Sequence, residues 1–111
     1  MGNDGNGMQA GRELDALVAG ALKGWEPGFI EHLKENDGWI LIPQYSTDWR
    51  RMGELVEEAR KQDIYLDILP NETCYISETK TMSNATIGKA IKSEAPHAAC
   101  LAFLEAKGLA I

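Results

Sequence analysis

Hydrophobic residues recur at helical spacing near the start of the chain. The spacing i, i+3, i+4, i+7 places apolar side chains on one face of a helix, and it predicts a helix over residues 12–23. Gly24 suits the end of this helix, and Pro27 keeps it from continuing. The apolar positions of that face are Leu14, Leu17, Val18, Ala21, Leu22 and Trp25.

The same spacing predicts two more helices. The second begins at Ser46 or Thr47 and reaches about residue 62, because a serine or threonine hydroxyl can accept hydrogen bonds from the free N–H groups of a helix start. The third runs from about residue 94 to residue 107, with Ser93 as its N-cap and Gly108 as its stop. The buried face of the second helix is predicted to comprise Trp49, Met52, Leu55, Val56 and Ala59.

Apolar and polar residues alternate in the segments 64–68 and 73–77, as they do in strands with one buried face. The turn residues between the two segments favour a β-hairpin. Residues 86–87 fit either a third strand or a loop. The short apolar segment 39–42 fits a strand or an extended stretch, which the proline at position 43 limits.

Helices combined with a small antiparallel sheet predict the α+β class, in a single layered domain over residues 12–111. The length of 111 residues is near the usual size of one domain. Residues 26–38 are expected to be connective, with a short helical turn around Phe29. Residues 1–11 are rich in glycine and are expected to form a flexible N-terminal lead.

Charge and hydropathy exclude several classes of partner. The formal net charge of -6 repels nucleic-acid phosphates, so no binding of nucleic acid is expected. No apolar run approaches the ~20 residues of a membrane-spanning helix, and the N-terminal residues do not resemble a secretory signal. The two cysteines are therefore expected to be reduced thiols in the cytoplasm.

No local motif predicts a catalytic residue, a cofactor or a metal site. His97 and Cys100 are three residues apart on a predicted helix, and Cys74 is the alternative third ligand of a metal. The usual CxxC or HxxxH spacing of zinc sites is missing, so we interpret Cys100 as a small core residue instead. The glutamates of the second helix alternate with arginines and lysines, which is typical of a solvated charged face.

The tryptophans and the sheet bear on self-association. A tryptophan most often anchors a core, and we interpret the three in this chain in that way, with an interface as the alternative. The edges of a small sheet invite pairing with another chain unless they are covered. A homodimer with two-fold symmetry would hide both features, and we expect one.

Three separated segments resemble the phage ABA sandwich domain family. They are the segment 12–19 (RELDALVA) followed by Gly24-Trp25, the segment 43–48 (PQYSTD) that leads into the second helix, and the segment 95–106 (APHAACLAFLEA). The chain departs from the family pattern at Tyr75 and Glu94. The resemblance implies a three-layer α/β/α sandwich with a small, mainly antiparallel sheet, encoded by bacteriophages and prophages and located in the cytoplasm of the bacterial host. It implies no established reaction.

The motif at Tyr45, Ser46, Thr47 and Asp48 has two interpretations. It is either a capped helix start with Tyr45 packed beneath it, or a ligand-binding helix N-terminus that receives an anion or a nucleotide. The expected function is that of a non-enzymatic phage or prophage accessory protein that acts by binding. One alternative is an antagonist of a host defence system that blocks a host protein or sequesters a nucleotide-like small molecule. The others are a small enzyme with a site assembled by the fold, and a component of the phage particle.

Overall fold

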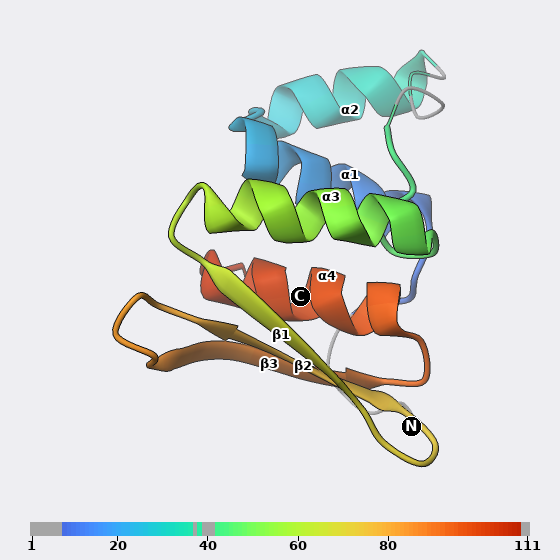
Figure 1. The fold of residues 1–111 in the computed structure, drawn as a ribbon. Helices are drawn as coiled ribbons and strands as arrows, with labels where there is room; N and C mark the ends of the chain where they lie inside the picture. Colours follow the sequence, from blue (N-terminus) through green and yellow to red (C-terminus); the bar gives the residue numbers. More distant parts are fainter. Residues whose placement is uncertain (1–7, 37, 39–41, 110–111) are drawn as a thin grey trace.

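The computed structural model describes residues 8–36, 38 and 42–109. Residues 1–7 of the predicted N-terminal lead and most of the segment 39–42 lie outside the described residues. The elements follow one another in the order shown in Figure 1. They are α1 (Arg12–Lys23), α2 (Pro27–Glu35), α3 (Trp49–Arg60), β1 (Tyr65–Pro70), β2 (Tyr75–Lys80), β3 (Thr86–Lys92) and α4 (Ala95–Ala106).

The three strands form one antiparallel sheet in the order β1-β2-β3. Ser77 of β2 pairs with Ile68 of β1 and with Ala90 of β3, and this row faces the helices. Side chains alternate between the two faces of a strand, so the adjacent row around Ile76 faces the other way. The predicted hairpin and the predicted antiparallel sheet are both confirmed, and the ambiguous residues 86–87 begin a full third strand.

Helix α4 lies between the sheet and the other helices (Figure 1). It is buried nearly all round, because its residues are small or apolar on every side. A helix of this kind needs packing partners on opposite sides. The sheet covers one side of α4, and α1 and α3 cover the other.

The predicted α+β class is confirmed, and the order of the layers follows from α4. Among the described residues, the sheet forms the first layer and α4 the second. Helices α1 and α3 form the third layer, and α2 packs on α1 (Figure 1). The expected α/β/α order would place a helical layer on each face of the sheet. Here the described helices all lie on the same side, since the second helical layer packs on the apolar helix α4 instead.

A very close approach joins the sheet to α4. The Thr79 hydroxyl of β2 donates a hydrogen bond of 3.1 Å to the backbone oxygen of Ala102 in α4. A Cβ atom on Gly88 of β3 would lie only 2.4 Å from that same oxygen. Only glycine leaves room for this contact, so Gly88 fixes how near the helix can lie to the strand.

The predicted face of the second helix is correct in phase but not in its extent. Met52, Leu55 and Ala59 are buried, whereas Val56 is half-buried and Trp49 is 52% exposed. Trp49 lies in the first turn of α3, where its ring makes a T-shaped contact with the Tyr75 ring at a centroid distance of 5.7 Å. It therefore covers the end of the sheet rather than filling the core.

The remaining tryptophans do not form a single cluster. Trp25 is half-buried, and its ring packs edge-on against Phe29 with the centroids 5.0 Å apart. That contact joins the end of α1 to α2, which is a helix of nine residues rather than the single turn expected. Trp39 lies outside the described residues.

Two predicted helix caps are wrong. The predicted second helix starts at Trp49, and its N-cap is Asp48 rather than Ser46 or Thr47. The helix α4 has Glu94 at its N-cap position, without a side-chain hydrogen bond, so Ser93 does not cap it. The first helix has the predicted bounds, and Gly24 adopts the left-handed conformation at its end.

Candidate functional site

The four residues of the predicted ligand-binding motif form the turn that leads into α3. Tyr45 is 3% exposed and Ser46 is 1% exposed, whereas Thr47 is exposed and Asp48 is half-buried. The motif therefore does not present four neighbouring side chains to a ligand. Thr47 and Asp48 alone reach the surface.

The Ser46 side chain is held by the first helix. Its hydroxyl donates to a carboxylate oxygen of Asp15 at 2.7 Å, and its backbone N–H donates to the same oxygen at 2.8 Å. The Ser46 hydroxyl in turn accepts a hydrogen bond of 2.9 Å from the Gly11 N–H. These contacts tie the turn before α3 to the start of α1. They also occupy the hydroxyl that a ligand would need.

Asp15 is a carboxyl group in a nearly water-free position, with 3% of its surface exposed. Burial raises the pKa of Asp15, while the two hydrogen bonds from Ser46 and the charge of Arg12 oppose that shift. The group is thus less readily ionised than a surface aspartate. It acts as an acceptor that positions Ser46.

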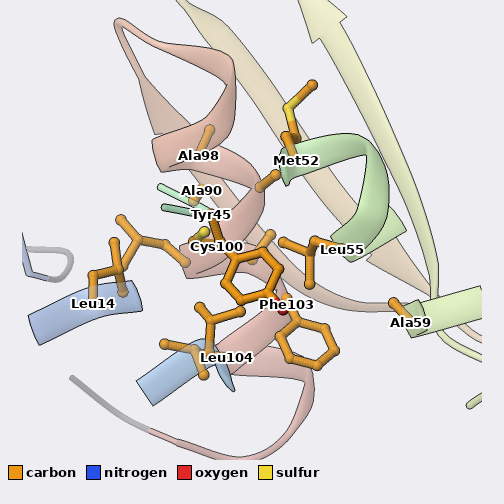
Figure 2. Packing of buried hydrophobic residues seen from close by; sticks show 14 of the residues in the cluster. Leu14, Tyr45, Met52, Leu55, Ala59, Ala90, Ala98, Cys100, Phe103 and Leu104 are labelled. Atoms are coloured by element: carbon orange, nitrogen blue, oxygen red, sulfur yellow. The ribbon is translucent and has the colours of Figure 1, made fainter. Parts of the chain in front are cut away.

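Tyr45 and Asp48 also have structural roles. The Tyr45 ring belongs to the buried cluster that holds Leu55 and Leu104 (Figure 2), and its burial raises the pKa of the phenol. The Asp48 carboxylate accepts a hydrogen bond of 2.8 Å from the Arg50 N–H, which is the contact of a helix N-cap. The side chain of each member of the motif except Thr47 therefore has a packing or hydrogen-bonding contact that explains it.

The three residues of the alternative metal site, His97, Cys100 and Cys74, have different surroundings. His97 Nε2 lies 2.7 Å from the backbone oxygen of Met8. Cys100 is fully buried, and burial raises the pKa of its thiol well above the usual range, whereas Cys74 is half-buried. In the part of the chain that the structure describes, no three histidine, cysteine or carboxylate side chains come together as metal ligands would.

The glutamates of α3 are engaged in ion pairs along its exposed face. Arg51 meets Glu54 at 2.9 Å, and Arg60 meets Glu57 at 2.9 Å. Exposed pairs of this kind contribute little to stability, because water and salt screen them. They support the interpretation of a solvated face rather than an acid–base site.

None of the described helices has the length and apolarity needed to span a membrane.

The most distinctive exposed surface is the side of the sheet that faces away from the described helices. We call it the outer face, and it consists of Tyr65, Asp67, Leu69, Ile76, Glu78, Lys80, Ile87, Lys89 and Ile91. Its strands pair so that Leu69, Ile76 and Ile91 lie side by side in one apolar row. Leu69 is 51% exposed and Ile91 is 46% exposed. An apolar row that crosses three strands is unlike the scattered apolar residues of an ordinary surface.

A charged row lies next to the apolar row. Asp67, Glu78 and Lys89 are paired across the three strands, and Lys80 lies beyond them on β2. The Lys80 ammonium is 3.0 Å from Asp67 and 3.7 Å from Glu78. The hydrogen bond to Asp67 is the main reason why the pKa of Lys80 is raised. These charges therefore compensate one another within the face.

A hollow of about 350 Å³ lies at the end of the outer face that is remote from the apolar row. Met82 on its rim is 74% exposed. The hollow offers both donors and acceptors of hydrogen bonds, together with one aromatic ring. Its lining residues are Tyr65, Asp67, Lys80, Thr81, Met82 and Asn84.

Sequence reasoning missed this face because it did not assign β3. The signal was present in the alternation of Ile87, Lys89 and Ile91 with the small residues Gly88 and Ala90. The small residues lie under α4, and the long ones point outward. That pattern is typical of a strand packed closely beneath a helix.

Comparison of the chain with protein-family models, with curated proteins and with solved structures finds no match.

Proposed function

We propose that the protein is a non-enzymatic accessory protein that acts by binding another protein through the outer face of its sheet. The observation that carries this proposal is the apolar row of Leu69, Ile76 and Ile91 on a face that the described helices leave open. The origin in a phage or prophage, and the location in the cytoplasm of a bacterial host, are part of the proposal. They are supported by the three sequence segments that resemble the phage ABA sandwich domain.

The composition of the face supports a protein partner. Protein interfaces have an apolar centre surrounded by polar groups that keep hydrogen-bonding partners. The apolar row supplies the first part, and the compensated charges of Asp67, Glu78 and Lys80 supply the second.

The burial of the motif at residues 45–48 also favours this choice of surface. The Ser46 hydroxyl is hydrogen-bonded to Asp15 and Gly11, and the Tyr45 ring packs in the core. A ligand at that helix start would meet only Thr47 and the capping carboxylate of Asp48. The carboxylate would repel an anion. We therefore place the binding surface on the sheet.

The experiment compares capture by the wild-type protein with capture by Leu69→Lys and Ile91→Lys variants in a bacterial lysate. The control is Phe29→Lys, since Phe29 is 43% exposed on α2, away from the sheet. We expect a partner that the wild type and the control retain and the two face variants lose. The purified partner should then slow amide hydrogen exchange in β1, β2 and β3. Equal capture by all folded variants, or protection confined to other elements, would refute the binding of a bacterial protein through this face.

The hollow beside Lys80 supports a second candidate function, the sequestration of a small polar molecule. Its volume of about 350 Å³ reaches the range of small-ligand pockets. A panel of mono- and dinucleotides tests this candidate by thermal shift. Stabilisation by one of them should be lost in Lys80→Gln and kept in Lys61→Gln, which changes an exposed lysine on the α3 side. A panel without any stabilising compound would leave no support for nucleotide binding at the hollow.

A further inference from the structure

We infer that two copies of this chain associate through their outer faces, about a two-fold axis that runs along β2. This inference rests on the proposed function, because it names the partner of the same face. It differs from pairing of strand edges, which would extend the sheet sideways. Here the two sheets would pack face to face, at the spacing of about 10 Å that is usual for stacked sheets.

The order of the residues on the face is the first argument. A rotation of 180° about an axis along β2 exchanges the positions of β1 and β3 and keeps every residue in its row. Leu69 then lies opposite Ile91 of the second copy, and Ile76 lies opposite its own counterpart. The apolar row is thus covered by an identical apolar row, as an interface with two-fold symmetry requires.

The charges are the second argument. The same rotation places Asp67 opposite Lys89 of the second copy, and Lys89 opposite Asp67 of the second copy. Glu78 meets its own counterpart near the axis, where each carboxylate is already 3.7 Å from Lys80 and 3.9 Å from Lys89. The opposed charges at the two outer strands therefore attract, and the central charges are compensated within each copy.

The net charge of the chain is the third argument. The formal charge of -6 makes two copies repel each other over most orientations. On the outer face two carboxylates, Asp67 and Glu78, are balanced by two ammonium groups, Lys80 and Lys89. Approach through this face avoids the general repulsion. A second copy is therefore a better match to the face than a strongly charged partner.

The size of the face sets the strength of the association. Three strands spaced about 4.8 Å apart, each about six residues long at about 3.3 Å per residue, give a footprint of a few hundred Å². Stable interfaces bury about 800 Å² on each partner. We therefore expect a weak dimer that exchanges with the monomer.

Charge reversal at the two outer strands tests the arrangement by sedimentation equilibrium of the full chain. Asp67→Lys and Lys89→Asp should each weaken self-association about tenfold or more, because each places like charges opposite one another. An equimolar mixture of the two variants should associate as the wild type does. In the mixed dimer each new lysine faces an aspartate, and each unchanged aspartate faces a lysine. Glu57→Lys and Arg60→Glu on α3 are the matched controls, and neither should change association.

Three results would overturn the inference. They are a wild-type protein that stays monomeric up to about 1 mM, single variants that associate like the wild type, and a mixture that fails to recover. Circular dichroism of each variant shows that it is folded before it is compared. A monomeric wild type whose captured partner is still lost in Leu69→Lys and Ile91→Lys would refute the dimer alone. Failure of both experiments would refute the binding role of the face as well.

Discussion

The backbone N–H and the hydroxyl of Ser46 both donate to the same oxygen of Asp15, at 2.8 and 2.7 Å. The two residues are far apart in the sequence, and their contact fixes the start of α3 against the start of α1. The Asp15 carboxylate provides the acceptor for both donors of Ser46, but burial of its negative charge away from water is unfavourable. This cost gives the contact a measurable dependence on pH.

The change Asp15→Asn should become more favourable as the pH rises. Burial raises the pKa of Asp15 in the folded chain above the ordinary aspartate value of about 3.9. The folded state therefore holds this proton more tightly than the unfolded state, so the wild type loses stability from Asp15 as the pH rises from about 3.9 through the raised pKa. Asparagine does not titrate, and its side-chain oxygen can still accept from Ser46.

Urea unfolding of both proteins between about pH 3.5 and pH 7 measures this difference. The free energy of unfolding of the variant, minus that of the wild type, should increase across the interval and then level off. The other titrating groups are shared, so their effects largely cancel in the subtraction. A difference that stays flat, or that falls with pH, would contradict the assigned direction of the Asp15 pKa.

Removal of the true cap of α3 should cost stability, whereas removal of the Thr47 hydroxyl, one of the two expected caps, should not. Asp48→Ala deletes the acceptor of the Arg50 N–H and should lower the free energy of unfolding by about 0.5–2 kcal/mol. Thr47→Ala changes an exposed side chain just before it and should have an effect within about 0.5 kcal/mol. Chemical denaturation of the two variants separates the cases. Equal losses would show that both residues support the helix start.

Two glycine-to-alanine changes should have opposite signs. Gly88→Ala places a Cβ atom 2.4 Å from the Ala102 oxygen, so it should destabilise the fold by about 1–3 kcal/mol or more. Gly53→Ala adds a methyl group in the open on the middle of α3 and should stabilise it by about 0.5–1 kcal/mol. Thermal unfolding of the pair provides its own control. A tolerated alanine at position 88 would mean that α4 can move away from β3.

Two hydroxyl groups beneath α4 should differ in what their removal does. The Ser77 hydroxyl is fully buried and has no hydrogen-bond partner among the described residues, so Ser77→Ala should leave stability unchanged or raise it by up to about 1 kcal/mol. Thr79→Val keeps the shape of its side chain but removes the donor to Ala102, which should cost about 0.5–1.5 kcal/mol. Denaturant midpoints measured in parallel decide the matter. A large loss at Ser77 would reveal a partner for its hydroxyl.

The residue pattern by itself was sufficient for elements that are defined by local spacing. The helix over residues 12–23 has the predicted bounds, and the predicted third helix and hairpin are present. These elements could be recognised because the apolar period of a helix or strand is visible within a few turns of the chain. The same pattern gave the buried phase of α3 through Met52, Leu55 and Ala59.

Only the tertiary structure decided what the polar residues do and which sheet face remains open. Ser46 resembles a helix cap in the sequence, yet its partners are Gly11 and Asp15. The apolar row of Leu69, Ile76 and Ile91 draws one residue from each strand. Such contacts depend on the register of the strands and on the docking of helices, which bring together residues that are distant in the chain. The apolar spacing of helices and strands can be recognised in the sequence. The free energy that selects these pairings arises only when the core packs.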